Sequence, residues 1–201
     1  MGRRIGLLGG TFDPPHVGHL WLAETAREQL QLDEIWFLPV GEPPHKTDRL
    51  ITAVSHRLHM TQLAIADHTL FFLKRDDIDR PLPHTTVTLL QQLKRLQPAT
   101  DFWLILGGDS LNDLPTWSAP QTLIQFCRLG VLPRPGTTVS WRDLVAAIPG
   151  IETAVDQLDG PTCELSSTDI RHWARQGSSL RYLLPTAVIK YIKTNQLYMN
   201  D

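Results

Sequence analysis

The chain has few cysteines and no long apolar run. Its 201 residues include only Cys127 and Cys163, which lie far apart and fit no metal-ligand spacing. We therefore expect two free thiols in a reducing compartment, and the cytoplasm as the location of the protein. No apolar stretch is long enough for the hydrophobic part of a signal peptide or for a membrane-spanning helix, so we expect no membrane partner.

The chain also lacks an excess of charge of either sign. Its 19 Lys and Arg against 21 Asp and Glu give a formal net charge of -2, and basic residues form only short pairs such as Arg3-Arg4. This distribution disfavours nucleic acid as a partner. The 42% hydrophobic and 20% charged residues are typical of a globular protein. We expect a single domain over residues 1–201, with a C-terminal helical part, about 166–201, packed on the rest.

Two common nucleotide-binding patterns are missing as well. The glycines Gly6, Gly9 and Gly10 do not have the G-x-G-x-x-G spacing of dinucleotide-binding enzymes, and no Walker A sequence occurs. Hydride-transfer enzymes and P-loop enzymes are therefore disfavoured.

What the chain does contain is a regular alternation of short strand-like runs and longer helix-like runs. We expect strands over 5–8, 34–38, 70–73, 102–106 and 127–132, and helices over 17–30, 55–66, 85–96, 168–176 and 186–194. This alternation predicts an α/β fold with a parallel sheet covered by helices. Ser55 and Ser167 are the expected N-caps, Pro185 suits the start of the last helix, and Gly177 suits a helix stop.

The most informative segment follows the first strand. Residues 9–19 read Gly-Gly-Thr-Phe-Asp-Pro-Pro-His-Val-Gly-His, which predicts a strand, a tight turn and a helix. The N-terminus of that helix would offer N–H groups and a positive dipole to an anion, with His16 and His19 one turn apart beside them. We therefore expect a phosphate-binding site. A zinc pair is disfavoured because no Asp or Glu stands at a suitable offset in this helix.

These residues resemble the nucleotidyltransferase superfamily whose signature is His-x-Gly-His after a Gly-x-Phe-Asp turn. More narrowly, the chain resembles the bacterial nicotinate-nucleotide adenylyltransferases through five blocks in the same order: GGTFDPPHVGHL, DEIWFLPVGEPPHK, GGDS with PTW just after it, the PRPG loop, and SSTDIR followed by LLP and a terminal LY. The resemblance implies a Rossmann-like, doubly wound parallel sheet. It also implies an enzyme of NAD biosynthesis that transfers adenylate from ATP to nicotinate mononucleotide and releases pyrophosphate, with Mg²⁺ as cofactor.

The resemblance also implies roles for individual residues. The catalytic residues would be His16, His19, Lys46 and Arg171. The ATP-binding residues would be Gly9, Gly10, Thr11, Phe12, His16, Gly18, His19, Gly107, Asp109, Arg134, Ser166, Ser167, Thr168, Ile170 and Arg171. The nicotinate nucleotide would meet Lys46, Thr85 and Trp117. We expect no protein ligand to a metal, because Mg²⁺ tends to keep its waters and to bind the triphosphate oxygens.

Several of these residues have a plainer interpretation when each is taken alone. Lys46 and Arg134 fit solvated surface cations, and Asp109 fits a helix cap. Arg171 opposes the dipole of its own helix and so favours a nearby anion, although an exposed side chain beside a plain cap also fits. Trp117 fits either a packed aromatic residue or a platform on which a base stacks.

The acceptor side departs from the family pattern. His84 stands where the family usually has tyrosine, and Ser118 follows Trp117 where an aromatic residue is common. The alternatives are therefore an adenylyltransferase acting on phosphopantetheine or nicotinamide mononucleotide, a cytidylyltransferase acting on a small phosphorylated alcohol, and an ATP-binding module without turnover. The four cationic catalytic residues favour an enzyme over such a module. The protein would be a monomer or a homodimer.

Overall fold

The centre of the molecule is a six-stranded parallel sheet. The structure is a computed structural model that describes residues 2–41, 51–81, 83–133 and 136–199. The strands are β1 (Arg4–Gly10), β2 (Glu34–Pro39), β3 (Phe71–Leu73), β4 (Asp101–Gly107), β5 (Arg128–Leu132) and β6 (Val155–Gln157). Their order is β3-β2-β1-β4-β5-β6, and every neighbouring pair is parallel. This is the doubly wound order of a Rossmann-like fold, so the predicted fold class is confirmed.

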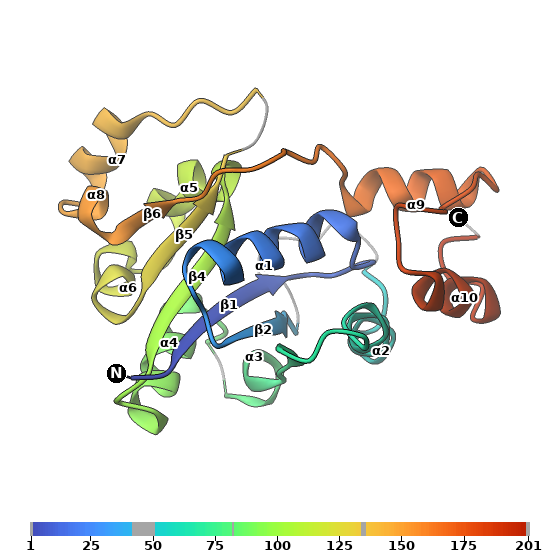
Figure 1. Cartoon of the computed structure of the whole chain (residues 1–201), viewed down its shortest axis with the longest axis horizontal. Helices are drawn as coiled ribbons and strands as arrows, with labels where there is room; N and C mark the ends of the chain where they lie inside the picture. Colours follow the sequence, from blue (N-terminus) through green and yellow to red (C-terminus); the bar gives the residue numbers. More distant parts are fainter. Residues whose placement is uncertain (1, 42–50, 82, 134–135, 200–201) are drawn as a thin grey trace.

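Helices cover both faces of the sheet (Figure 1). They are α1 (Val17–Gln29), α2 (Val54–Ala64), α3 (Asp76–Asp79), α4 (Thr86–Leu96), α5 (Gly108–Asp113), α6 (Pro120–Phe126), α7 (Trp141–Ala147), α8 (Ile151–Ala154), α9 (Ser167–Arg175) and α10 (Thr186–Thr194), with a 3-10 helix, η1 (Leu114–Thr116). In Figure 1, α1 crosses the front of the sheet, and α9 and α10 lie to the right, beyond the carboxyl end of β1.

Two buried clusters form the core, one on each face. Successive side chains of a strand point to opposite faces, so Ile5 and Leu7 of β1 join one cluster while Leu8 joins the other. The cluster around Leu8 includes Ala23 of α1, Met60 of α2, Ile170 of α9 and Val188 of α10. The other cluster includes Leu90 of α4 and Leu123 of α6. The C-terminal helices therefore share one core with α1 and α2.

The structure corrects both predicted serine caps. The N-cap of α2 is Ala53, because the amide of Arg57 bonds to its carbonyl and closes the first turn there. The N-cap of α9 is Ser166, whose hydroxyl accepts the amide of Asp169 at 3.2 Å. Ser167 is instead the first helical residue, and its hydroxyl makes a tertiary contact described below.

The predicted helix stop at Gly177 is confirmed. Gly177 has φ +68, which a glycine adopts without a steric penalty. Its amide bonds to the Ala174 carbonyl at 3.0 Å, and the Ser178 amide bonds to the Trp173 carbonyl at 3.0 Å. These two bonds are a Schellman motif, which satisfies the last carbonyls of α9.

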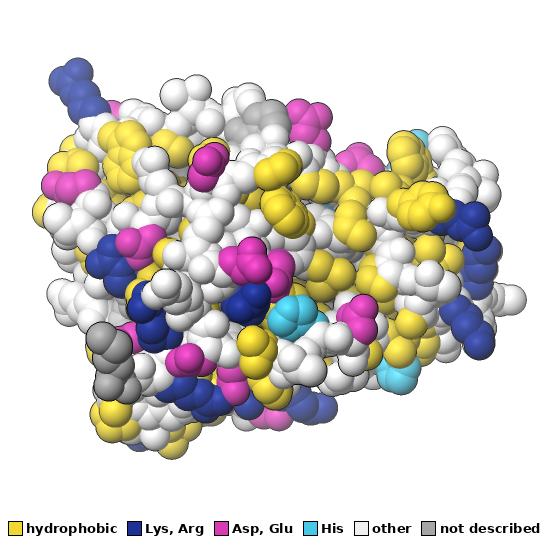
Figure 2. Space-filling view, viewed as in Figure 1, with side chains coloured by type: hydrophobic (Ala, Val, Ile, Leu, Met, Phe, Trp, Pro, Cys, Tyr) yellow, Lys and Arg dark blue, Asp and Glu magenta, His cyan; other side chains and the backbone are white. Residues whose placement is uncertain are grey.

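The surface charges and the state of the cysteines agree with the expectations drawn from the composition. Figure 2 shows acidic and basic side chains mixed over most of the visible face, with basic ones gathered at the right edge. Both cysteines are free, with Cys127 buried and Cys163 half-buried. Within the described ranges, no helix has the length and apolar character to cross a membrane.

Candidate active site

The candidate site lies where the sheet reverses its winding, between β1 and β4. Gly10 ends β1 and Gly107 ends β4, and each strand leads into a helix, α1 after a loop and α5 directly. Ligands of open parallel sheets bind outside the carboxyl ends of the strands at this switch point. The two helix N-termini also place partial positive charge there. The fold thus brings the predicted residues of 9–19 and 107–109 to one edge.

The two histidines of the motif lie against each other. His16 is the N-cap of α1, with an extended backbone, and is 3% exposed. The Nδ1 atom of His19 accepts the backbone N–H of His16 at 3.2 Å, and the ring centroids are 3.8 Å apart. A neutral imidazole that accepts at Nδ1 carries its proton on Nε2. The backbone therefore sets His19 as a donor through Nε2.

Gly18 is required between the two histidines. A Cβ built on Gly18 would lie 3.0 Å from Nδ1 of His16 and 3.3 Å from Sγ of Cys163. Both distances are tighter than ordinary contacts, so a side chain here would displace the His16 ring. The glycine of His-x-Gly-His therefore allows the close approach of the ring and the segment that carries Cys163.

Phe12 holds the turn before α1 in a strained conformation. Its φ is 50, in the left-handed region that bulky residues rarely adopt, and its side chain is 1% exposed. The ring packs edge-on to His19 at 5.0 Å and against Phe37 at 5.7 Å. No described atom lies within 4 Å of a Cβ built on Gly9, so the surface beside the turn is open. Strain held by burial is typical of functional loops.

The N-terminus of α9 meets this loop from the far end of the chain. The Ser167 hydroxyl donates to the Pro14 carbonyl at 2.8 Å. The buried Arg171 donates to the Asp13 carbonyl and to Thr168 Oγ1, the latter at 3.2 Å. Its Nη1 lies 3.9 Å from Oδ2 of Asp13. The sequence predicted an anion beside Arg171, and one such anion is the Asp13 carboxylate of this chain. Because Arg171 is buried, its interpretation as an exposed surface residue is wrong.

Two further predicted ATP-binding residues have defined places. The side chain of Ile170 is fully buried in the core cluster that it shares with α1, α2 and α10. Asp109 lies in the first turn of α5, whose N-cap is Gly107, and its side chain is exposed. The capping interpretation of Asp109 is therefore wrong, and its carboxylate stands at the carboxyl end of β4.

The residues predicted for the nicotinate end lie around α4 and α6. Thr85 is the N-cap of α4, and its hydroxyl accepts the Thr88 amide at 3.4 Å. Trp117 follows η1, is half-buried and packs against the core cluster on the α4 face. The buried part of the ring fits the packed-aromatic interpretation of Trp117. Lys46 and Arg134 lie outside the described residues.

Comparisons with known proteins extend the resemblance over the whole chain. A family model described as cytidylyltransferase-like matches residues 7–173. A probable nicotinate-nucleotide adenylyltransferase of Synechococcus sp. is 43% identical over 200 residues, covering 98% of this chain and 96% of the relative. One from Thermomicrobium roseum is 40% identical over 195 residues, covering 97% and 91%. This chain belongs to the nicotinate-nucleotide adenylyltransferase family. It is therefore a nucleotidyltransferase enzyme, as its motifs predict.

A solved structure of the family has the same fold. The nicotinic acid mononucleotide adenylyltransferase of Plasmodium falciparum, in complex with NaAD, matches with a TM-score of 0.81. The match covers 98% of this chain and 97% of that one, at 21% sequence identity. The architecture is thus shared even where the sequences have diverged.

The sequence analysis did not identify Arg57, a buried residue whose side chain holds the backbone around the candidate site. Its side chain is 1% exposed. Its nitrogens donate to four carbonyls: Thr11 at 2.8 Å, Val40 at 2.8 Å, Gly41 at 2.7 Å and Thr52 at 2.9 Å. Burial lowers the pKa of Arg57, and the charge of nearby Asp13 opposes that shift. Arg57 thus joins the loop after β1 to the end of β2.

A second missed element is the buried ion pair of Asp77 and Arg80, which are 2.7 Å apart. Arg80 also donates to the Pro83 carbonyl at 2.7 Å, to Thr88 Oγ1 at 2.6 Å and to the Thr85 carbonyl at 3.0 Å. These bonds fix the turn that presents the N-terminus of α4. The one available signal in the sequence was the pair of opposite charges three residues apart, just before Thr85.

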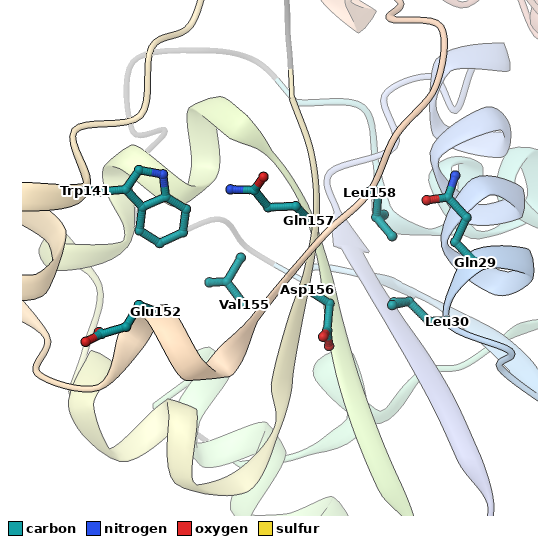
Figure 3. Close-up of a pocket in the computed structure, with 8 residues that line it drawn as sticks. All are labelled: Gln29, Leu30, Trp141, Glu152, Val155, Asp156, Gln157 and Leu158. Carbon is teal, nitrogen blue, oxygen red and sulfur yellow. The ribbon is translucent and has the colours of Figure 1, made fainter.

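Two hollows of the described surface lie away from the candidate site. One, of about 590 Å³, lies beside β6 and the C-terminal end of α1, away from His16. Figure 3 shows Trp141, Val155 and Gln157 on one side of it and Gln29 and Leu30 on the other. A second, of about 680 Å³, lies between the end of α9 and α10. Neither is lined by a predicted site residue, and no group of three or more metal-ligating side chains gathers within the described segments.

Proposed function

We propose that this chain transfers adenylate from ATP to nicotinate mononucleotide, with release of pyrophosphate, in NAD biosynthesis. The observation that carries the proposal is the histidine pair at the N-terminus of α1, located at the switch point of a chain that matches nicotinate-nucleotide adenylyltransferases over its full length. The coverage of these relatives favours this acceptor over phosphopantetheine and over a non-catalytic ATP-binding module.

The reaction needs no side-chain nucleophile. An oxygen of the nicotinate mononucleotide phosphate attacks the α-phosphorus of ATP, the bond from that phosphorus to the bridging oxygen of the β-phosphate breaks, and pyrophosphate leaves. Because the attacking group is already an anion, the protein's task is to align two polyanions and to stabilise the charge that develops on the α-phosphoryl oxygens. Nε2–H of His19 donates to such an oxygen, and the positive end of the α1 dipole adds to this stabilisation.

ATP binds across the carboxyl ends of β1 and β4 and the start of α9. The triphosphate lies along Gly9, Gly10, Thr11, Phe12, His16, Gly18 and His19. The carboxylate of Asp109 accepts from ribose hydroxyls beside Gly107. The start of α9 closes the pocket through Ser166, Ser167, Thr168, Ile170 and Arg171, with Arg134 completing it. The contacts of Ser167 with Pro14 and of Arg171 with Asp13 support this grouping, because they hold the start of α9 against the loop before α1.

The acceptor lies on the α4 side of the switch point. The N-terminus of α4, capped by Thr85, faces the nicotinate end, where free amides favour a carboxylate over a carboxamide. Trp117 contributes the exposed part of its ring, and Lys46 contacts the phosphates.

Mg²⁺ accompanies ATP in this proposal. The residues fit an ion held by triphosphate oxygens and water, since the described part of the site is rich in donors and the carboxylate of Asp13 is already bonded to this chain's own groups. When bound, the ion neutralises charge on the triphosphate.

The deciding experiment measures pyrophosphate release from MgATP with nicotinate mononucleotide, nicotinamide mononucleotide and phosphopantetheine in parallel. We expect the highest kcat/KM with nicotinate mononucleotide. A preference for phosphopantetheine would contradict the proposal. Tight ATP binding without pyrophosphate release from any acceptor would identify a module without turnover.

A further inference from the structure

The last described residues of the chain return to the candidate site. Tyr198 follows α10, and its hydroxyl donates to Oδ1 of Asp13 at 2.6 Å. Asp13 is only 4% exposed and lies in the loop between β1 and α1, three residues before His16. The C-terminal segment is thus bonded directly to the loop that presents the histidines.

The Asp13 carboxylate joins two further segments to this loop. Its Oδ2 accepts the Thr52 amide at 3.3 Å and lies 3.9 Å from Nη1 of Arg171. The same guanidinium donates to the backbone carbonyl of Asp13. One buried carboxylate therefore connects the loop, the segment before α2, the start of α9 and the C-terminal segment.

Tyr198 is held as a permanent donor in this network. Burial and the negative charge of Asp13 raise the pKa of Tyr198 far above its ordinary value, so the phenol stays protonated wherever the protein is folded. Its backbone has φ 63, a left-handed conformation that costs energy in an aromatic residue. The tertiary contacts of the side chain outweigh that cost.

The two oxygens of the Asp13 carboxylate have different donors, and this difference affects the position of Arg171. Oδ1 is satisfied by Tyr198, whereas Oδ2 faces both Thr52 and the guanidinium. A buried carboxylate oxygen without a donor is costly. Arg57 is also near Asp13, but its nitrogens are bonded to four carbonyls. If the phenol were removed, Arg171 would therefore be the cation that closes on Asp13, and it would be drawn away from the nucleotide.

We propose that Tyr198 is a positioning residue for adenylyl transfer, which acts through Asp13 to set the loop of 11–16 and the place of Arg171. This inference rests on the proposed function, because the role of Arg171 toward the nucleotide belongs to it. Asp13 ends the Gly-x-Phe-Asp turn and Tyr198 belongs to the terminal Leu-Tyr block, but the resemblance assigns neither of them a role, and we place neither of them in contact with the reacting atoms.

The test compares Tyr198→Phe with Tyr191→Phe. Tyr191 is a matched control, because its hydroxyl also makes one hydrogen bond in the C-terminal part, at 2.8 Å to Nδ1 of His56, and this bond joins α10 to α2 without contacting Asp13. We expect Tyr198→Phe to lower kcat/KM for ATP by roughly tenfold, the scale of one lost hydrogen bond, with a smaller change in KM for nicotinate mononucleotide. Tyr191→Phe keeps wild-type kinetics, while both variants shift the Tm by similar amounts.

A second measurement does not depend on turnover. Hydrogen–deuterium exchange of the amides of 16–20 becomes faster in Tyr198→Phe and not in Tyr191→Phe. In an Asp13→Asn background, Tyr198→Phe adds little to either readout, because the two residues act as a unit. Unchanged exchange in 16–20, or kinetics equal to those of Tyr191→Phe, would overturn the inference. An inactive wild type would instead refute the proposed function, and the exchange comparison would still decide whether Tyr198 sets the loop.

Discussion

His19 shows how the backbone assigns a chemical role to a side chain. With Nδ1 accepting the His16 amide at 3.2 Å, the proton of the neutral ring sits on Nε2. The ring also packs against Phe12 in an edge-to-face arrangement, with the two ring centroids 5.0 Å apart. A donor held in place before the reaction stabilises developing charge without reorganisation. This arrangement of the pair supports the oxyanion stabilisation that we propose for His19.

The first prediction concerns His19→Ala. We expect kcat to fall by roughly 10²- to 10³-fold, the range of a lost oxyanion donor, while the fold stays intact because the imidazole is only half-buried. Steady-state pyrophosphate release and far-UV circular dichroism measure the two effects. Wild-type turnover in a folded variant would remove His19 from the mechanism.

The second prediction concerns Asp109→Ala. The exposed carboxylate is proposed to hold ribose hydroxyls, which are remote from the reacting phosphorus, so we expect KM for ATP to rise about tenfold with a smaller change in kcat. Kinetics at varied ATP and saturating acceptor measure this difference. A fall in kcat at unchanged KM would contradict the ribose role.

At the scale of elements, one side chain of the edge strand β6 links that strand to β5 and β4. Asp156 binds Arg128 of β5 through two contacts of 2.6 Å and accepts from Nε1 of Trp103 on β4 at 2.8 Å. The bond to Arg128 is the main reason that the pKa of Asp156 lies below its ordinary value, and burial partly opposes the shift. Besides its backbone pairing with β5, this three-residue strand is thus attached by a carboxylate that binds side chains of β5 and β4.

The third prediction is that Asp156→Asn destabilises the protein by roughly 1 kcal/mol at pH 7, or about 2–4 °C in Tm, the range expected for a protein of this size. A depressed carboxyl pKa contributes stability above the unfolded value of about 3.9, and that contribution is lost as pH falls through the lower folded value. The difference between variant and wild type should therefore shrink below about pH 4.

The matched control for this prediction is Asp79→Asn. Asp79 pairs with Arg75 at 2.9 Å on one exposed helical turn, and such pairs contribute little to stability. Thermal unfolding at pH 7 and pH 3.5 compares the two variants. An equal loss in both would show that Asp156 is an ordinary surface charge.

At the scale of the whole molecule, the C-terminal helices are part of the main core. Ile170 of α9 and Val188 of α10 lie in the same buried cluster as Ala23 of α1. We therefore propose one cooperative domain over the whole chain, as the length and composition predicted.

The fourth prediction uses Cys127 as a reporter of this cooperativity. Burial raises the pKa of its thiol to about 12, so the thiolate needed for reaction is scarce in the folded state. We expect Cys163 to react with Ellman's reagent in the native protein, and Cys127 to react only on unfolding. Its labelling midpoint in urea should coincide with that from circular dichroism. Rapid labelling of Cys127 in water, or two separate midpoints, would contradict a single cooperative domain.

Long periodic segments could be predicted from the sequence because they bury a continuous stripe. The Val87, Leu90 and Leu93 pattern of α4 is buried as expected, and the strands from β1 to β5 all lie within two residues of their predicted bounds. The missed elements are short: β6 and η1 have three residues each, α3 and α8 have four, α5 has six, and α6 and α7 have seven. A helix of at most seven residues spans fewer than two turns, so its apolar residues recur too few times to show a period, and its structure depends on its neighbours.

The candidate site likewise has a part that the sequence predicts and a part that only the tertiary structure shows. The sequence alone determined the strand, turn and helix around His16 and His19, since local chemistry and spacing suffice for a phosphate-binding turn. Only the tertiary structure decided that Arg171 faces Asp13, that Arg57 binds four carbonyls, and that Tyr198 reaches a carboxylate 185 positions earlier. Contacts between distant segments depend on how the sheet winds and how the helices pack on it, and no local pattern encodes that geometry.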